Sequence, residues 1–333
     1  MDYKISEIIT VIIPCYKVSN SILKVIQNID HNIQNIIVVD DCCPEKSGEL
    51  VLASNQDKRV TVLFHPTNLG VGGAMKTGYK KALELNSDIV VKLDGDGQMD
   101  PSLIIDFAIP ILIGEADYTK GNRFYSPESL VKMPLVRLFG NGILCFINKV
   151  VSGYWTIMDP TNGYTAIHAV ALKNLPFEKI DNRYFFENDM LFRLNTIRAK
   201  VEDIPMKALY GDEKSNLCVL KTMAQFPFKY ASRFFKRISY NYFIRDFNIG
   251  SLEIFFGVLL FGFGLLYGMY HWVHSAFLNM DTPVGTIILS STTLFIGFQL
   301  LLSAINFDMN NMPQSPISKF HTTRKNKKAS IYT

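Results

Sequence analysis

The sequence predicts an α/β domain with an open parallel sheet, followed by two helices that cross a membrane. Short apolar runs rich in β-branched residues alternate with helical patterns through the first part of the chain, an order typical of parallel sheets. Near the other end, two long stretches contain no charged residue and are long enough to span a bilayer. The 333 residues therefore hold one large domain and additional elements.

Four strands are expected in the first part of the chain. Residues 8–13 form an apolar run that ends at Pro14, and residues 36–41 read IIVVDD. Residues 59–66 and 88–94 are the third and fourth strands, with a helical segment between them that begins GGAMKTG. Ligands of such sheets bind beyond the carboxyl ends of the strands. The polar residues that gather there are Tyr16, Asp40, Asp41, Asp94 and Asp96.

Composition narrows the class of protein. A net charge of +4 is too small to indicate binding to nucleic acid, so no nucleic-acid partner is expected. The five cysteines show neither a C-x-x-C pair nor the Cys/His spacing of a zinc site. Their odd number, with no secretory signal pattern before the first strand, favours a reducing, cytosolic environment for the α/β domain.

Residues 254–273 and 283–307 are the two uncharged stretches, and the connector between them has no Lys or Arg. A helix of a soluble domain normally keeps a polar stripe, which both stretches lack. Lys and Arg cluster before the first stretch and after the second, so the positive-inside rule places the α/β domain and both chain ends in the cytoplasm. We expect an integral membrane protein, most simply of a bacterial inner membrane. The expected divisions are the α/β domain 1–216, an amphipathic interfacial segment 217–249, a helical hairpin 250–307 and a basic tail 308–333.

The segment VVKLDGDGQMDP places several acidic residues after the fourth strand. Asp96 and Gln98 alternate with glycines, so their oxygens can point to one side of an extended turn. Such oxygens suit Mg²⁺ or Mn²⁺ held jointly with a diphosphate, although a solvated acidic turn is the simpler alternative. Asp100, followed by Pro101, is expected to cap the next helix.

Three other binding motifs are excluded. Met75 precedes Lys76 where a P-loop requires glycine, and it also occupies the third glycine position of the dinucleotide fingerprint. Met99 and Ile105 stand where a calcium-binding EF-hand loop requires glycine and glutamate.

Seven motifs in order resemble one enzyme family: VIIPCYK, IIVVDDCCPE, NLGVGGAMKTG, DGDGQMDP, GNRF, DPTNGYTAI and YFFENDML. The chain resembles the inverting glycosyltransferases of family 2, which have the GT-A, Rossmann-like fold. More narrowly, it is similar to polyprenyl-phosphate glycosyltransferases, such as dolichyl-phosphate mannose synthases and undecaprenyl-phosphate sugar transferases.

The resemblance implies a nucleotide pocket lined by Pro14, Tyr16, Asp40 and Asp41. It implies that Asp94 faces the ribose or the water shell of the metal, and that Asp96 and Gln98 bind the metal, Mg²⁺ or Mn²⁺.

On the acceptor side, the resemblance places Arg123 near the phosphates and Asp159 beside the acceptor, as a base or an orienting group. Glu187 and Asp189 are alternatives for the base. Family members often carry arginine and glycine before a late Ser-Lys pair, whereas this chain reads YGDEKSNL, so Lys214 would supply the positive charge.

Two segments have the composition of helices that lie on a membrane surface. Residues 130–151 and 226–245 interleave apolar or aromatic residues with Lys and Arg. Arg137 is the candidate in the first segment for binding the lipid phosphate. Core helices with basic residues that reach the surface remain the alternative.

The expected activity is transfer of a sugar, with inversion, from a UDP- or GDP-linked donor to a membrane polyprenyl phosphate. Another lipid or glycan acceptor, or a membrane-anchored sugar-nucleotide binding protein without turnover, are the alternatives. The Q-x-x-R-W motif of processive synthases is absent, which argues against chain polymerisation. A homo-oligomer is possible through small residues of the first membrane stretch, which are Gly257, Gly262, Gly264 and Gly268.

Overall fold

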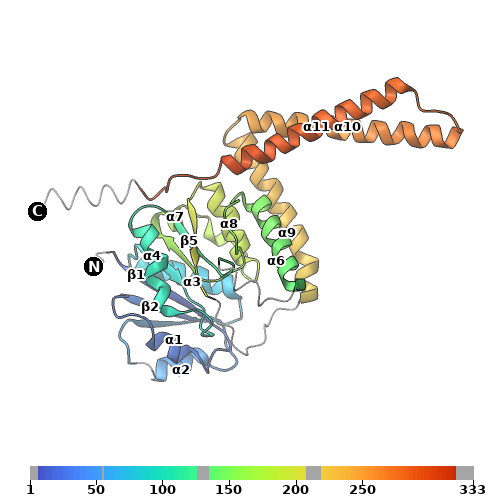
Figure 1. Ribbon diagram of the computed structural model, residues 1–333. Helices are drawn as coiled ribbons and strands as arrows, with labels where there is room; N and C mark the ends of the chain where they lie inside the picture. Colours follow the sequence, from blue (N-terminus) through green and yellow to red (C-terminus); the bar gives the residue numbers. More distant parts are fainter. Residues whose placement is uncertain (1–6, 55, 126–134, 208–218, 320–333) are drawn as a thin grey trace, which may run out of the picture. The chain divides into compact units, whose positions relative to one another are not determined.

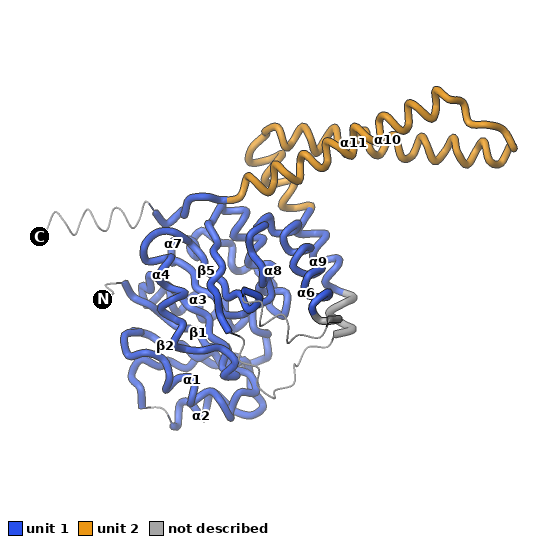
Figure 2. The backbone as a smooth tube through the Cα atoms, viewed as in Figure 1, with its two compact units in different colours: residues 1–234, 313–333 blue, residues 235–312 orange. Residues whose placement is uncertain are grey.

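The computed structural model describes the chain except residues 1–6, 55, 126–134, 208–218 and 320–333. It divides into two compact units, shown in Figure 2. The sheet unit comprises Met1–Phe234 and Pro313–Thr333, and the hairpin unit comprises Phe235–Met312. The boundaries therefore fall after residues 234 and 312, whereas the sequence placed divisions after residues 216, 249 and 307.

The described part of the sheet unit contains one seven-stranded sheet with the order β3-β2-β1-β4-β6-β5-β7. All neighbouring strands are parallel except β6, which runs antiparallel to both β4 and β5. The expectation of a parallel sheet thus holds for β1 to β4, and among the described strands only β6 departs from it. The strands are β1 (Ile9–Cys15), β2 (Asn35–Asp40), β3 (Val60–Phe64), β4 (Ile89–Lys92), β5 (Tyr118–Asn122), β6 (Thr165–His168) and β7 (Val201–Pro205).

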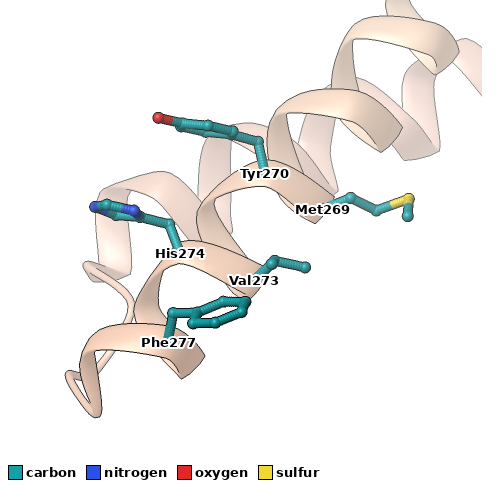
Figure 3. Close-up of a pocket in the computed structure, with 5 residues that line it drawn as sticks. All are labelled: Met269, Tyr270, Val273, His274 and Phe277. Carbon is teal, nitrogen blue, oxygen red and sulfur yellow. The ribbon is translucent and has the colours of Figure 1, made fainter.

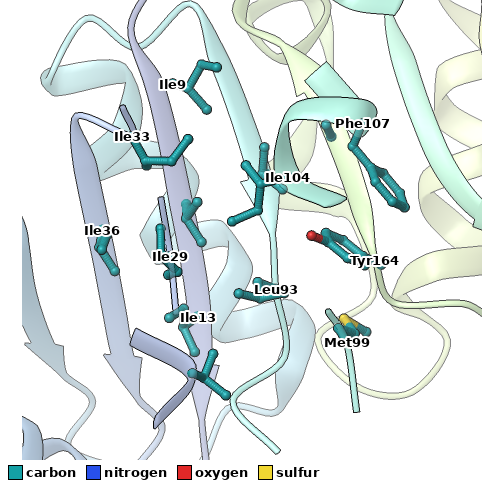
Figure 4. Packing of buried hydrophobic residues seen from close by; sticks show 14 of the residues in the cluster. Ile9, Ile13, Ile29, Ile33, Ile36, Leu93, Met99, Ile104, Phe107 and Tyr164 are labelled. Atoms are coloured by element: carbon teal, nitrogen blue, oxygen red, sulfur yellow. The ribbon is translucent and has the colours of Figure 1, made fainter. Parts of the chain in front are cut away.

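Helices cover both faces of the sheet because successive strand residues alternate between two buried clusters. Val11 and Ile13 of β1 pack with α1 and α4, whereas Ile12 packs with α3 and α8. Figure 4 shows the first cluster, in which Phe107 of α4 stacks on Tyr164 with ring centroids 4.0 Å apart. The result is a three-layer domain (Figure 1).

The helical segments that the sequence predicted between the first four strands are confirmed as α1, α2 and α3, the last of which begins in the glycine-rich segment. Two short 3₁₀ turns, Pro101–Leu103 and Phe177–Lys179, connect longer elements. The helices are α1 (Ile22–Gln27), α2 (Ser47–Ser54), α3 (Val71–Glu84), α4 (Ile104–Leu112), α6 (Leu135–Ser152), α7 (Ala169–Asn174), α8 (Phe186–Thr196) and α9 (Val219–Ser239), whose last residues enter the hairpin unit.

In the hairpin unit, a π-helical turn, Tyr240–Ile244, precedes α10 (Ile249–Leu278) and α11 (Val284–Asn310). By length and composition, both helices are long and apolar enough to cross a membrane. Each extends beyond the expected stretch. In particular, α10 continues through His274 and ends only at Asn279, which adopts the left-handed conformation with φ 48°.

Glycines allow α10 and α11 to pack closely. A Cβ atom at Gly264 would lie 2.6 Å from the backbone nitrogen of Leu294, and one at Gly257 would lie 3.0 Å from Leu301. Gly268 likewise faces α11, whereas Gly262 has no neighbouring atom within 4 Å. Most of the small residues considered for oligomerisation therefore serve packing within the chain, and a homo-oligomer stays a prediction.

The base of the hairpin unit is held by a buried ion pair. Arg237 Nη1 lies 2.6 Å from Asp308 Oδ1, which also accepts the hydroxyl of Tyr242 at 2.6 Å. This network joins the segment before α10 to the end of α11, so both ends of the hairpin are fixed to each other.

After α11 the chain returns to the sheet unit. The backbone N–H groups of Ile317 and Ser318 each donate to the carboxylate of Asp117 at 2.9 Å. Asp117 is fully buried and precedes β5, and it also accepts the N–H of Lys200. The C-terminal segment is thus part of the sheet unit.

Candidate functional site

Polar residues at or just after the carboxyl ends of three parallel strands, β1, β2 and β4, lie together along the side of the sheet where these strands end. Cys15 of β1 lies opposite Asp40 of β2, and the N–H of Leu93, just beyond β4, donates to the carbonyl of Ile12. The carboxyl ends of these strands are therefore neighbours, and the residues that follow them lie at the same edge. These are the predicted nucleotide and metal residues Pro14, Tyr16, Asp40, Asp41, Asp94, Asp96 and Gln98.

Asp40 and Asp41 are buried and hold the surrounding loops in place. The two oxygens of Asp40 accept the N–H groups of Cys43 and Gly48, each at 2.7 Å. Asp41 accepts two N–H groups of the glycine-rich loop at 2.8 and 2.7 Å and lies 2.8 Å from His65 Nδ1. Tyr16, in contrast, is exposed, so it presents its ring at this edge.

The turn after β4 is closed by one of its own side chains. Asp96 Oδ1 accepts the N–H of Gln98 at 2.9 Å, and Gly97 adopts a positive φ of 79° that favours glycine. Asp100 caps the following 3₁₀ turn by accepting the N–H of Ser102, with Pro101 at its start, which confirms the predicted cap.

This turn fits a hard divalent cation in donor chemistry, because it offers carboxylate and amide oxygens on partly exposed side chains. Among the residues that the structure describes, no group of three or more His, Cys, Asp or Glu side chains can hold a metal ion. A cation at Asp96 and Gln98 would therefore need further oxygens from a ligand or water.

A buried lysine beneath the turn was not predicted. Lys92, the last residue of β4, is 1 % exposed, and its Nζ lies 2.6 Å from Asp94 Oδ1 and 3.6 Å from Glu187 Oε1. Burial alone would lower the pKa of Lys92, but Asp94 and Glu187 raise it above its usual value. Part of the negative charge at this strand end is thus compensated from within the protein. A lysine inside an apolar strand is the sequence signal for such a group.

Arg123 and Asp159 form a tight buried pair. Arg123 Nε donates to Asp159 Oδ2 at 2.6 Å, and Nη2 donates to Oδ1 at 2.9 Å. Asp159 is fully buried, whereas 29 % of the Arg123 side chain is exposed. The arginine side chain is therefore partly accessible, and its guanidinium occupies both oxygens of the carboxylate.

Gly163 joins this pair to the acidic turn. A Cβ atom at Gly163 would lie 2.7 Å from Asp94 Oδ2 and 2.5 Å from Lys92 Nζ. Only glycine leaves room for this contact without displacing the charged groups. Because Gly163 belongs to the DPTNGY segment that contains Asp159, the motifs assigned to the donor and acceptor sides are neighbours.

Burial shifts the ionisation of three more groups around the pair. It lowers the pKa of Lys120 to about 8, against the opposing effect of Glu187 and Asp159. It raises the pKa of Asp203, on β7, to about 6. It also raises the pKa of Glu187, which Lys92 and Lys120 partly offset.

The remaining candidates are placed as follows. Asp189 is fully buried and bound by Arg193 at 3.2 Å and Arg233 at 2.5 Å, so it links α8 to α9 and lies in the interior. Arg137 lies on α6, but its side chain is outside the described residues, as is the whole of Lys214.

A separate apolar pocket lies on α10 of the hairpin unit, where Met269, Tyr270, Val273, His274 and Phe277 surround it. Tyr270 and His274 stack with ring centroids 5.9 Å apart (Figure 3). It contains no carboxylate and none of the predicted site residues.

The fold matches solved structures of one architecture. Glucosyl-3-phosphoglycerate synthase from Mycobacterium tuberculosis, solved with Mn²⁺, UDP and phosphoglyceric acid, superimposes with a TM-score of 0.52 at 16 % identity, covering 70 % of this chain and 78 % of that one. This likeness defines the fold class, a mixed α/β sheet of the GT-A type.

Sequence comparison is more specific. The profile of Glycosyl transferase family 2 matches residues 10–175. A UDP-N-acetylglucosamine–dolichyl-phosphate N-acetylglucosaminyltransferase of Methanococcus voltae is 32 % identical over 220 residues, which cover 62 % of this chain and 87 % of that protein. An undecaprenyl-phosphate mannosyltransferase of Micrococcus luteus is 28 % identical, over 52 % of this chain and 70 % of that protein. The chain belongs to glycosyl transferase family 2.

Proposed function

We propose that the protein transfers a sugar from a nucleoside diphosphate sugar, UDP- or GDP-linked, to a membrane polyprenyl phosphate. The observation that supports this proposal is the close packing of Gly163, in the segment that contains Asp159, against Asp94 and Lys92. The relatives named as dolichyl-phosphate and undecaprenyl-phosphate sugar transferases support the choice of acceptor.

In the proposed reaction, a phosphate oxygen of the lipid attacks the anomeric carbon of the sugar. The bond from this carbon to the diphosphate breaks on the opposite face, so the configuration inverts and the nucleoside diphosphate leaves. The lipid phosphate is already largely ionised at neutral pH, since its second pKa is about 6. A strong general base is therefore not required.

Each side chain of the site has a proposed task. Tyr16 and Asp94 bind the nucleoside, and Asp96 with Gln98 hold a Mg²⁺ or Mn²⁺ ion. This ion would neutralise charge on the diphosphate. Arg123 faces the phosphates. Because its carboxylate is buried against Arg123, Asp159 acts by orienting this guanidinium.

The membrane part of the proposal is supported by α6, α10 and α11. On α6, the large apolar residues Phe139, Ile143 and Phe146 are exposed, as expected for a helix that rests on a membrane surface. With α10 and α11 as the spanning hairpin, the basic flanks favour a cytoplasmic location for the sheet unit and both chain ends. Arg137 and Lys214 are proposed to bind the acceptor phosphate.

The test is a transfer assay with the full chain in nanodiscs, polyprenyl phosphate, Mn²⁺ and a panel of labelled UDP- and GDP-sugars. We expect label from one donor to enter the lipid fraction, and none when polyprenol without phosphate replaces the acceptor. Absence of lipid-bound label across the panel, from protein that binds UDP or GDP, would refute the proposal. The donor that transfers also identifies the nucleotide and the sugar.

A further inference from the structure

We propose that two buried lysines, Lys92 and Lys120, are positioning residues, and that each lysine fixes one side of the site. Lys92 fixes Asp94 on the donor side, and Lys120 fixes the loop that carries Asp159 on the acceptor side. The assignment of the sides rests on the proposed function.

The two lysines lie in one row across the sheet. Lys92 of β4 and Lys120 of β5 are both paired in register with Thr165 of β6, which lies between them. Residues opposite one another in a sheet project from the same face, so both side chains enter the layer between the sheet and α8. Their exposed fractions are 1 % and 0 %.

Lys92 contacts the donor side. Its ammonium group donates to Asp94 Oδ1 at 2.6 Å, and this leaves Oδ2 of Asp94 directed toward Gly163. The Asp94 side chain is 30 % exposed, so the contact fixes a carboxylate that a ligand can still reach. Charge-assisted hydrogen bonds of this kind are short and strong, and they restrict the rotamer of the carboxylate.

The Lys120 side chain contacts the acceptor side at the backbone of the loop that carries Asp159. Its ammonium group donates to the carbonyl of Asn162 at 2.5 Å, in the same loop as Asp159. The Asn162 side chain reaches Asp159 Oδ2 at 3.5 Å. Lys120 therefore holds the backbone of the loop, while Arg123 binds the Asp159 carboxylate that the loop carries.

Glu187 of α8 serves both lysines as a shared counter-charge. It lies 3.6 Å from Lys92 Nζ, and its charge also acts on Lys120. Burying charged groups is costly even when they are paired, and apolar residues of similar size often give equal stability. Two lysines in the core are thus better explained by what they hold than by stability.

The experiment uses Lys92→Met and Lys120→Met in the full chain in nanodiscs. UDP and GDP binding with Mn²⁺ is measured by calorimetry, and the KM for polyprenyl phosphate by the transfer assay. We expect Lys92→Met to weaken nucleotide binding about tenfold, the effect of losing one charge-assisted hydrogen bond, with little change in acceptor KM. Lys120→Met should change the acceptor KM or kcat and leave nucleotide binding within about twofold.

Thr10→Val is the matched control. Thr10 is a buried polar residue of β1 that bonds to Ser87 at 2.6 Å, near the opposite end of the strand. The Thr10→Val variant should lower the thermal midpoint of unfolding and leave the nucleotide dissociation constant and the acceptor KM unchanged. If Lys92→Met does not fold, Lys92→Gln, which keeps a donor toward Asp94, is measured and should bind nucleotide more tightly than a folded Asp94→Ala variant.

The outcomes separate the two proposals. If a lysine variant changes the nucleotide dissociation constant and the acceptor KM equally, or changes neither, the positioning roles are overturned. Transfer by the wild type would in that case still support the proposed function. A wild type that neither binds nucleotide nor transfers sugar would overturn the proposed function and this inference with it.

Discussion

The carboxylates on the two sides of the site differ in burial and in how they are paired. Asp94, at the end of the parallel half of the sheet, is 30 % exposed and bound to Lys92 through one oxygen. Asp159, beside the mixed half, is fully buried and bound to Arg123 through both oxygens. The proposed donor side thus keeps a partly exposed carboxylate, whereas the proposed acceptor side pairs a buried carboxylate with a partly exposed arginine.

The largest effect on stability is expected on the acceptor side. Arg123→Met leaves Asp159 buried without its cation, and breaking such a pair costs about 3–5 kcal/mol of unfolding free energy. Transfer activity should also be lost, because the arginine proposed to face the phosphates is removed. Denaturant unfolding in detergent measures the first effect and the lipid assay the second.

The control is the double variant Arg123→Met with Asp159→Asn, which removes the buried charge. It should recover much of the stability but none of the activity. If Arg123→Met alone lowers the unfolding free energy by less than about 1 kcal/mol, Asp159 does not become an uncompensated buried charge in that variant.

An intermediate effect is expected at Asp203, which also belongs to the acceptor side. Its pKa is raised by burial to about 6, so the fold favours the protonated acid. The associated stability is present below the ordinary pKa of 3.8 and is lost as pH rises through about 6. This loss amounts to roughly 3 kcal/mol at neutral pH, at 1.36 kcal/mol per unit.

Asp203→Asn cannot ionise, so it should gain stability relative to the wild type as pH rises from about 4 to about 7. Thermal midpoints of both proteins across this range measure the difference. A difference that is constant with pH would contradict the raised pKa.

The smallest effect on stability is expected on the donor side. Asp96→Asn changes a half-buried turn residue and should alter unfolding free energy by less than about 0.5 kcal/mol. It should nevertheless abolish the rise in thermal midpoint that Mn²⁺ and nucleotide together produce. Asp100→Asn is the matched control, since Asn caps a helix as well as Asp does. An Asp96→Asn variant with the full Mn²⁺-dependent rise would refute the metal assignment.

The sequence was informative where the chemistry is local. The four parallel strands, α3, the cap at Asp100 and the two apolar helices follow from short patterns of neighbouring residues. The assignment of Asp96 and Gln98 to a metal rests on a local pattern of the same kind and stays a prediction.

The remainder depends on contacts between distant residues. Arg123 and Asp159 are 36 positions apart, and the contact of Lys92 with Glu187 joins β4 to α8. The strands β5 to β7 are short and partly polar, with Lys120 inside one of them, so their pattern does not identify them as buried. Pairing through space decides these elements, and a single sequence does not reveal it.

The two backbone hydrogen bonds from Ile317 and Ser318 to Asp117 make the sheet unit discontinuous along the chain. In modular terms, the hairpin is an insertion into a domain whose final piece lies after it. A water-soluble version of the enzyme should therefore be made by excising residues 235–312 and rejoining the flanks through a flexible linker. Simple truncation before the hairpin would remove two of the donors to the buried carboxylate of Asp117.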